Sequence, residues 1–424
     1  MQSQPTARGR PGTPSLLRVL NDRAALDLLL GGEMLTRAQI SEYTGVSKVT
    51  VSQMLARLEE RGLVAIAGEQ AGGRGPNAAL YSVVPSSAYV AGLYVDFDLV
   101  SAAVADVTGR RVAEVSGNPN GTDDPVELVR STIEQACASA GIEVTRLSAL
   151  VIGSPGVVDP RTGDPRLAVN LPAWHEGALD ALTDAWHKPV VIENDVNLAA
   201  MAERADGAAV SVDDFVLVWL GVGLGLATIL GGRLHRGTAG AAGEIGYLPV
   251  HGAPLHTDLR HPASGGFQSL AGGNVVRELA AGHGFTAPTP AEAVRAAVSA
   301  ASYGDASHGD VSHGDVSHGD AGHGGGSSDR AEAFLGELAH RVAVGVASVC
   351  VVLDPGLVVL GGEVGRAGGT VLADRVAAAV ASIWPSRPRV VPTGVPGEPV
   401  LRGAMLAAVA RARSALLASV ADPQ

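Results

Sequence analysis

Residues 36–62 contain two short helical segments separated by a single glycine, and this spacing restricts how the N-terminal part of the chain can fold. Thr36 is placed to cap the first segment, and Ser47 is placed to cap the second by accepting a hydrogen bond from a free backbone N–H. Gly45 lies in the turn between them, where a positive φ costs glycine little. The segment therefore predicts a helix-turn-helix, and the alternative is an ordinary helical hairpin with a solvated face.

The second helical segment separates an apolar face from its polar residues. Val51, Leu55 and Leu58 share one face at helical spacing, which predicts that this face packs on a core. The remaining side chains are short polar or cationic groups, which reach phosphates and base edges in a major groove of DNA. The predicted DNA-binding residues of the helix pair are Ser47, Lys48, Thr50, Gln53 and Arg57.

A two-stranded wing is predicted directly after the helix pair. Two apolar runs of strand length, 63–67 and 80–83, flank the glycine-rich segment 68–76. Arg74 is expected near the loop tip, from which an arginine can enter a minor groove or contact a phosphate; the alternative is a solvated loop charge. With the amphipathic stretch upstream, the pattern predicts a winged helix-turn-helix domain over residues 15–84.

Charge is distributed unevenly along the chain. The formal net charge is −12, which argues against a general nucleic-acid binder. Residues 1–82 carry a net charge of +2, and the remainder carries −14. An acidic body repels DNA except where the N-terminal part docks, so we expect few phosphate contacts and salt-sensitive binding. A weakly basic module needs a second copy for tight binding, which predicts a homodimer or homotetramer.

Composition favours a globular cytoplasmic protein. With 424 residues and 46% hydrophobic content, the chain has material for two or three domains. No apolar run of about 18 residues lacks a charge or a turn signal, so no membrane span is expected. Residues 1–14 are polar and are expected to form a disordered leader. Cys137 and Cys350 are expected to be buried thiols in a reducing compartment.

The remainder of the chain predicts two similar α/β units. Strands are expected at 88–96, 99–106 and 111–115, followed by a helix that begins at Asp124. A comparable succession follows, with strands on both sides of the glycine run 221–225. Three strands, a crossover helix and then the same kind of unit again predict two α/β lobes with a cleft between them.

Several motifs of this body resemble those of the ROK family (repressors, open reading frames and sugar kinases). In chain order they are Ser154-Pro155-Gly156-Val157-Val158-Asp159, Asn170-Leu171-Pro172-Ala173-Trp174, Glu193-Asn194-Asp195-Val196-Asn197, Gly221-Val222-Gly223-Leu224-Gly225 and Ala242-Gly243-Glu244-Ile245-Gly246. The resemblance covers about residues 88–420. It implies an α/β, two-lobed actin-like (ribonuclease H-like) ATPase-type body, with lobe 1 at 88–198 plus a helix at 400–420, and lobe 2 at 199–399. Together with the predicted winged helix-turn-helix, the chain resembles the repressor branch of the family.

The resemblance also implies where an effector binds. A sugar presents hydroxyls that both donate and accept, so its site needs amides and carboxylates that converge on a cleft. In the kinases the residue matching Asp195 is the general base, whereas in a repressor the same carboxylate only holds the hydroxyl. The alternative role for the Asn and Asp residues is a loop or a helix cap. The candidate effector-binding residues are Asn170, Asn194, Asp195, Glu244, Tyr247 and Gln268.

Departures from the family pattern argue against an enzyme and against a zinc site. Phe97 and Asp98 stand where the kinases have a glycine-rich phosphate loop, so backbone approach is blocked and phosphate is repelled. Val222 replaces the usual Thr of the second phosphate loop, so phosphoryl transfer is not expected.

The signature motif and the zinc site of the family are also changed. Tyr247 replaces the signature His, and Gln268 replaces a sugar-contacting Glu. The family's zinc cysteines are replaced by Leu259, His261 and Gly266, a set that cannot form a tetrahedral zinc cage, so no cofactor is expected.

Residues 302–326 contain a repeated Ser-His-Gly-Asp unit that the resemblance does not explain. The segment is polar and rich in glycine, which predicts a disordered insertion in a loop of the second lobe. The alternative is weak metal capture, or a pH-dependent charge patch, formed by its histidines.

Three functions remain open. The first is a DNA-binding transcriptional regulator, a repressor, whose body senses a sugar, a sugar phosphate or a related metabolite in the cleft. The second is a ligand-independent or protein-controlled regulator with a degenerate cleft. The third and least favoured is a residual sugar kinase. The expected partners are operator DNA and a small-molecule effector, with no membrane.

Overall fold

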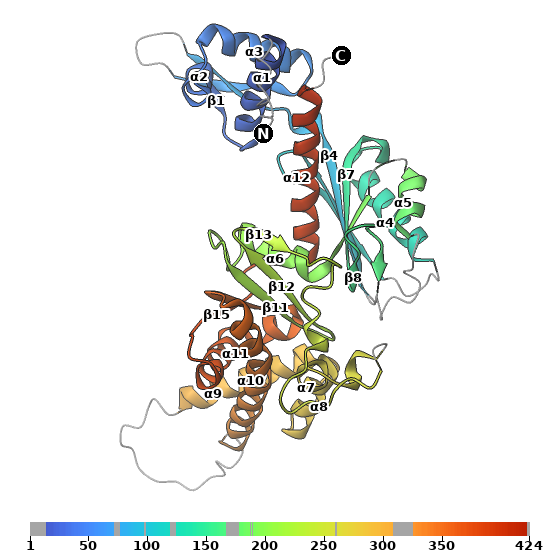
Figure 1. The fold of residues 1–424 in the computed structure, drawn as a ribbon, viewed down its shortest axis with the longest axis vertical. Helices are drawn as coiled ribbons and strands as arrows, with labels where there is room; N and C mark the ends of the chain where they lie inside the picture. Colours follow the sequence, from blue (N-terminus) through green and yellow to red (C-terminus); the bar gives the residue numbers. More distant parts are fainter. Residues whose placement is uncertain are drawn as a thin grey trace, which may run out of the picture.

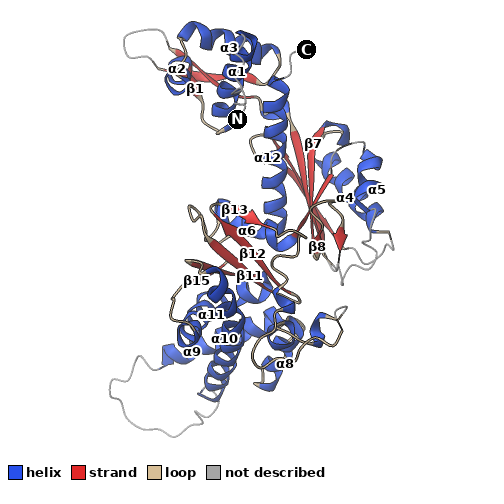
Figure 2. Ribbon diagram, in the orientation of Figure 1, coloured by secondary structure: helices blue, strands red, loops and turns tan. Residues whose placement is uncertain are grey.

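In the computed structural model the chain forms one three-stranded sheet, two five-stranded sheets and a short two-stranded ladder (Figure 1). Helices cover the faces of both five-stranded sheets (Figure 2). The small sheet belongs to the N-terminal module, defined here as residues 14–84. The structure describes residues 14–71, 77–96, 99–118, 124–166, 178–186, 188, 190–258, 261–307 and 325–421.

The N-terminal module contains the helix pair and the hairpin that the sequence predicts. Thr36 caps α2 in a capping box with Gln39, Gly45 ends that helix with a φ of 70°, and Ser47 caps α3 by accepting from the backbone N–H of Thr50. The small sheet has the order β1-β3-β2. The elements are α1 (Pro14–Leu30), β1 (Leu35–Thr36), α2 (Arg37–Thr44), α3 (Lys48–Glu60), β2 (Val64–Gln70) and β3 (Ala78–Val83).

The first five-stranded sheet has the order β10-β7-β4-β5-β6. Three antiparallel strands come first in the chain, β7 then pairs in parallel with β4, and β10 pairs in parallel with β7. The parallel strands are buried along almost their whole length, which is typical of a sheet covered on both faces. The elements are β4 (Tyr89–Val95), β5 (Val100–Asp106), β6 (Arg111–Gly117), α4 (Pro125–Ser139), β7 (Leu147–Ser154), β8 (Val157–Val158), β9 (Pro165–Arg166), α5 (Ala178–Trp186) and β10 (Val190–Asn194).

The second five-stranded sheet repeats this topology in the order β13-β12-β11-β14-β15. Its first three strands are again antiparallel, and β14 and β15 again add in parallel. Helix α6 leads into this sheet, and α10 and α11 pack together beside it. The elements are α6 (Asp195–Asp206), β11 (Phe215–Leu220), β12 (Leu224–Leu230), β13 (Arg233–His235), α7 (Gln268–Ala271), α8 (Gly273–Gly282), α9 (Pro290–Ser307), α10 (Gly325–Leu353), β14 (Leu357–Gly361), α11 (Gly362–Ile383) and β15 (Arg389–Pro392).

Helix α12 (Pro399–Ala421) connects the three parts of the molecule (Figure 1). At Gly403 it approaches α6 so closely that an added Cβ would lie 1.9 Å from the carbonyl oxygen of Leu198. Arg413 donates to the carbonyl oxygen of Val107 at the first five-stranded sheet, at 3.0 Å. Near the C-terminal end, the carbonyl oxygen of Ser419 accepts a hydrogen bond of 2.9 Å from Arg61 of the N-terminal module.

Two helices, α10 and α12, are long and apolar enough to cross a membrane by length and composition alone. The most apolar window of each is buried inside the protein to 56% and 39%, respectively. Core helices of globular proteins pass the same test, so this feature is weak evidence for a membrane span. Cys137 and Cys350 are both buried free thiols, and burial raises the pKa of each to about 11.

We expect Gly403→Ala to lower the free energy of unfolding by about 3 kcal/mol, because its Cβ would collide with the backbone of α6. Gly336→Ala is the matched control, since this helical glycine has no atom within 4 Å of an added Cβ. Alanine there should be neutral or stabilise by about 0.5–1 kcal/mol. Thermal unfolding of the two variants measures the difference, and an unchanged melting temperature for Gly403→Ala would contradict close packing of α6 and α12.

Candidate functional site

The first part of the candidate site is the outer surface of α3. Val51, Met54, Leu55 and Leu58 face the core with at most 1% exposure, so the other side of the helix faces solvent. Lys48 and Gln53 are exposed there. Ser47 and Thr50 are joined by a hydroxyl hydrogen bond of 2.9 Å, and Ser47 also accepts from the Thr50 backbone. Ser47 and Thr50 therefore fix the N-terminal end of α3, while Lys48 and Gln53 are presented outward.

Arg57 has a different position from the one expected of a DNA contact. Its Nε donates to Oδ2 of Asp22 on α1 at 2.8 Å, and a second nitrogen pairs with Oδ1 at 2.5 Å. The hydrogen bond to Asp22 raises the pKa of Arg57. Only 33% of the Arg57 side chain and 11% of the Asp22 side chain are exposed. The bidentate pair fastens α3 to α1 and engages two of the three guanidinium nitrogens, which disfavours the predicted DNA contact of Arg57.

Several predicted residues lie outside the described part of the chain. Among the site residues these are Arg74 of the wing and Asn170. The same holds for Phe97 and Asp98, for the leader up to residue 13, and for most of the Ser-His-Gly-Asp repeat, 308–324.

The second part of the candidate site lies at the N-terminus of α6. Asn194 is the N-cap of this helix, and its Oδ1 accepts from the backbone N–H of Asn197 at 3.0 Å. Its Nδ2 donates to the carbonyl oxygen of Gly156 and to Oδ1 of Asp195, each at 3.0 Å. Both amide hydrogens are therefore used within the protein. Asn194 positions Asp195 and joins α6 to the loop after β7.

Asp195 is a buried carboxyl with an unusual pKa. Its pKa is raised to about 7, above all by burial; the hydrogen bond from the Val196 backbone, at 2.8 Å, opposes this rise in pKa, and the charges of Asp96 and Glu244 contribute to it. Burial also raises the pKa of Glu244, and burial followed by the charge of Glu244 raises that of Tyr247. Asp96, Asp195 and Glu244 thus form one group from three chain segments, which we call the carboxylate site.

An ion pair between the two five-stranded sheets lies beside this group. Glu193 is the penultimate residue of β10, and its Oε2 is 2.6 Å from a guanidinium nitrogen of Arg236, which follows β13. The other oxygen of Glu193 accepts from Nδ2 of Asn197 at 2.9 Å and from the backbone of Asn194 at 3.1 Å. This ion pair, which the sequence did not predict, connects lobe 2 to the residues that orient Asp195.

The glycine loop, residues 221–225, is bound by side chains of the same chain. The backbone N–H of Val222 donates to Oε1 of Glu363 at 2.9 Å. Gln268 accepts from the backbone of Leu224 at 2.9 Å and donates to the carbonyl oxygen of Val222 at 2.7 Å. Both ends of the Gln268 amide therefore hold the loop, which disfavours the predicted contact of Gln268 with an effector. Glu363 lies in the first turn of α11, where the helix dipole favours an anion.

The segment that corresponds to the family's zinc site is stabilised by contacts between protein side chains. Tyr247 stacks on His256 with ring centroids 4.9 Å apart, and Nδ1 of His256 lies 3.3 Å from Oγ of Ser264. Within the described residues no three His, Cys, Asp or Glu side chains are grouped to hold a metal ion. A phenol, one imidazole and a hydroxyl do not fit a tetrahedral zinc centre.

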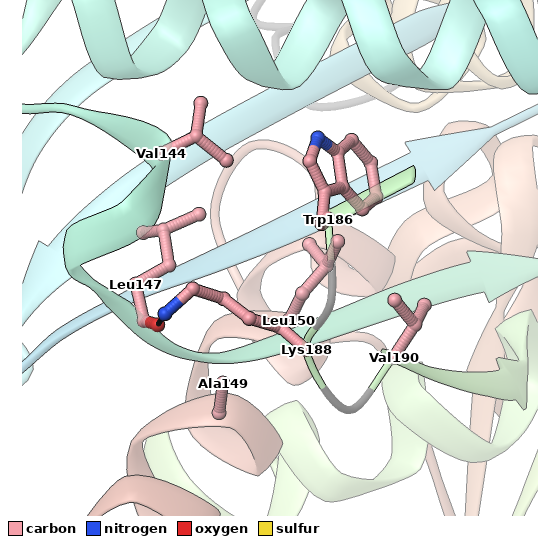
Figure 3. A pocket seen from close by; sticks show the side chains of 7 residues that line it. All are labelled: Val144, Leu147, Ala149, Leu150, Trp186, Lys188 and Val190. Atoms are coloured by element: carbon pink, nitrogen blue, oxygen red, sulfur yellow. Dashed lines mark hydrogen bonds between the residues drawn. The ribbon is translucent and has the colours of Figure 1, made fainter. Parts of the chain in front are cut away.

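A small cavity lies at the N-terminal ends of β7 and β10 (Figure 3), whereas Asn194 is at the C-terminal end of β10. Its volume of about 10 Å³ is enough for a single water molecule and too small for a sugar. It is lined by Val144, Leu147, Ala149, Leu150, Trp186, Lys188 and Val190, none of which is a predicted site residue. Lys188 closes one edge by donating to the carbonyl oxygen of Leu147 at 2.7 Å. The cavity is therefore not a candidate effector site.

Sequence reasoning missed Arg236 and Glu363. Glu363 carried a signal, because it follows two glycines at the end of the strand-like run 357–360, where a helix N-terminus is expected. Arg236 carried none, since only the tertiary fold brings it to Glu193.

Comparisons with known proteins cover both parts of the molecule. A model of the ROK family matches residues 92–408, and a model of the MarR family matches residues 21–75. The xylose repressor of Caldicellulosiruptor bescii is 28% identical over 246 residues, which are 57% of this chain. The chain spans only 61% of the length of that relative in this match.

Solved structures share the architecture. A ROK family transcriptional regulator, a homologue of the E. coli MLC protein, superposes with a TM-score of 0.69 at 17% identity and covers 96% of this chain and 99% of its own. A ROK hexokinase from Thermus thermophilus superposes with a TM-score of 0.56 at 26% identity and covers 75% of this chain and 97% of its own. The predicted fold, a winged helix-turn-helix followed by a two-lobed actin-like α/β body, is confirmed.

We expect Asp195→Asn to stabilise the protein more at alkaline than at acidic pH. The pKa of Asp195 is raised in the folded state, so its stabilising neutral form is fully present below pH 4 and is lost as the pH rises through about 7. Asparagine keeps the shape and the acceptor but cannot ionise. The melting temperature should rise by several degrees at about pH 8.5 and by less at about pH 5. An equal gain at both pH values would show that Asp195 is not held neutral by burial.

Proposed function

This chain belongs to the ROK family, and from this premise we propose that it is a DNA-binding transcriptional repressor whose body senses a sugar. The proposal joins two features of the chain: an N-terminal helix pair with an exposed polar surface on α3, and a carboxylate site at the start of α6. The similar protein from Caldicellulosiruptor bescii is named a xylose repressor, a name that combines a sugar with transcriptional repression.

One observation carries the proposal: the two sites share α12. The N-terminal end of this helix packs against α6 at Gly403, and α6 begins at Asp195. The C-terminal end packs against α1 and binds Arg61 of the N-terminal module. A ligand that shifts α6 therefore moves a helix that also supports the DNA-binding surface. Such a shared element gives the differential contacts that coupling between two sites requires.

For the DNA side we propose contacts from the exposed end of α3 and from the wing. Ser47, Lys48, Thr50, Gln53 and Arg74 are the proposed contact residues. Arg57 is left out, because it is paired with Asp22. The low charge of the module favours two copies on a two-fold operator, and thus a homodimer or homotetramer.

For the effector side we propose a neutral sugar held by Asp195, Glu244 and Tyr247, and we keep Asn170 as a further candidate. Carboxyl groups exchange hydrogen bonds with hydroxyls, whereas their ionised forms repel a phosphate group. The site therefore favours a sugar over a sugar phosphate. The Glu193–Arg236 ion pair beside it gives a sugar-dependent movement a route from one lobe to the other.

We further propose that the protein is not a kinase, because its glycine loop is already filled. A phosphate group bound there would need the N–H of Val222 and the N-terminus of α11; Glu363 accepts from that N–H and places a negative charge in the first turn of α11. Phosphoryl transfer depends on positioning phosphates and their magnesium ion, so a carboxylate at that point opposes it.

Glu363→Ala should create phosphate affinity that the natural chain lacks. The change frees the N–H of Val222 and removes a negative charge, so inorganic pyrophosphate should bind at least about tenfold more tightly. Glu363→Gln, which keeps an acceptor but no charge, is the matched control and should give an intermediate gain. Isothermal titration calorimetry measures both, and equal affinity for all three proteins would remove Glu363 from the explanation.

Separate substitutions in the DNA-binding surface and in the carboxylate site test the proposed regulatory function. Lys48→Ala should weaken DNA binding about tenfold or less without altering the response to a sugar, because it removes one exposed phosphate contact. Asp195→Ala should leave DNA binding intact and abolish the response. The readouts are DNA affinity by fluorescence anisotropy and melting-temperature shifts across a panel of neutral sugars and sugar phosphates. Full response in Asp195→Ala would show that the carboxylate site is not the sensor. Intact DNA binding with no sugar response in the natural chain would favour the degenerate-cleft alternative.

A further inference from the structure

The surface of α3 that points directly away from the core differs from the set of polar residues predicted to bind DNA. Val51, Met54, Leu55 and Leu58 are buried at one side of the helix. At 3.6 residues per turn, the opposite side is formed by residues 49, 53 and 56, spaced by four and then three. We call Val49, Gln53 and Ala56 the reading face, and all three are exposed.

Val49 is the unexpected member of this face. It is the second residue of α3, and its side chain is 69% exposed. The neighbouring Thr50 is tied to the Ser47 cap, so the first turn of the helix is fixed and presents Val49 to solvent. In a helix-turn-helix the first residues of the second helix meet the base edges of the major groove. An apolar side chain at that point is placed to contact a base and is poorly suited to contact a phosphate.

The chemistry of the face selects one kind of base pair. Valine and alanine methyl groups fit against the C5 methyl group of thymine, and a glutamine amide can bind N6 and N7 of adenine with two hydrogen bonds. Guanine is commonly read by arginine or lysine, and the reading face has neither. Arg57, which lies to one side of it, is held by Asp22.

Charge confines the contact to the first two turns of α3. Glu60 lies on the same side of the helix as the reading face, near its C-terminal end, and is exposed, as is Glu59. These carboxylates are repelled by DNA phosphates. Lys48, at the other end of α3, is attracted by the DNA phosphates. The helix therefore approaches DNA with its N-terminal end, which is where Val49 and Gln53 lie.

We propose that α3 reads A·T base pairs in the major groove, with Val49 against a thymine methyl group and Gln53 on adenine. The proposal rests on the proposed function and adds to it the chemical class of the operator and an apolar specificity residue. Val49 supplies discrimination at a single base, whereas Lys48 supplies attraction that is independent of sequence.

The test uses duplexes selected by the full-length protein from a random-sequence pool at low salt. In the selected duplex each thymine is replaced in turn by deoxyuridine, which removes only the C5 methyl group. The natural chain should lose about fourfold in affinity at one position of each half-site, the equivalent of one buried methyl group. Val49→Ala should lose affinity for the thymine duplex and be insensitive to deoxyuridine at that same position, which is the non-additivity expected of a direct contact.

Two controls separate this idea from the proposed function. Lys48→Ala should weaken binding to thymine and deoxyuridine duplexes equally and keep the sensitivity of the natural chain. Val49 is mostly exposed, so Val49→Ala should fold, and its unchanged melting temperature verifies this. Sequence-specific binding with no deoxyuridine effect, or with the effect retained in Val49→Ala, would overturn the role of Val49 alone. Failure to select any sequence would overturn the DNA-binding function and the reading face together.

Discussion

The contact between α6 and α12 at Gly403 is the constraint on which the rest of the structure depends. Without a side chain at this position the two helices approach until the Cα of Gly403 lies against the carbonyl of Leu198. Gly92 of β4 allows a similar approach to the backbone of Met405. As a result α12, α6, both large sheets and the N-terminal module share one continuous cluster of buried side chains. The module cannot move relative to α6 without disturbing surfaces that stabilise the fold.

Two sites in the body differ in whether their surroundings favour the ionised form of a carboxyl group. At the carboxylate site the charges of Asp96 and Glu244 act on Asp195, and burial raises the pKa of Asp195 to about 7. A ligand that brings hydroxyl donors supplies partners that favour the ionised form. At the glycine loop a single carboxylate, Glu363, meets a free backbone N–H and a helix N-terminus, which stabilise its charge. The first site therefore gathers carboxyl groups and suits a neutral polar ligand, whereas at the second the N–H of Val222 is already paired with Glu363.

Capping residues, turn residues and family motifs predicted the fold. The contacts that they did not predict join residues far apart in the sequence. Thr36, Gly45 and Ser47 act within a few residues of themselves, so their roles follow from sequence spacing. The family motifs located Asn194 and Asp195, and the helix-cap alternative is also true of Asn194. Arg57 pairs with Asp22 across a sequence separation of 35 residues. Val222 is hydrogen-bonded to Gln268 and to Glu363 across separations of 46 and 141 residues, respectively. No periodicity encodes such pairs, because they exist only once the sheets and helices are assembled.

The same long-range pairs define how the N-terminal module can recognise DNA. A net charge of +2 in residues 1–82, with one arginine held by Asp22, leaves little sequence-independent attraction, and the acidic body reduces it further. Weak attraction to phosphates lowers binding to the many non-operator sites that compete in a genome. Affinity must then come to a larger extent from base contacts, which are made by short, well-positioned side chains. A rigidly capped α3 with Val49 and Gln53 at its outer face meets this requirement, because little conformational entropy remains to be lost on binding.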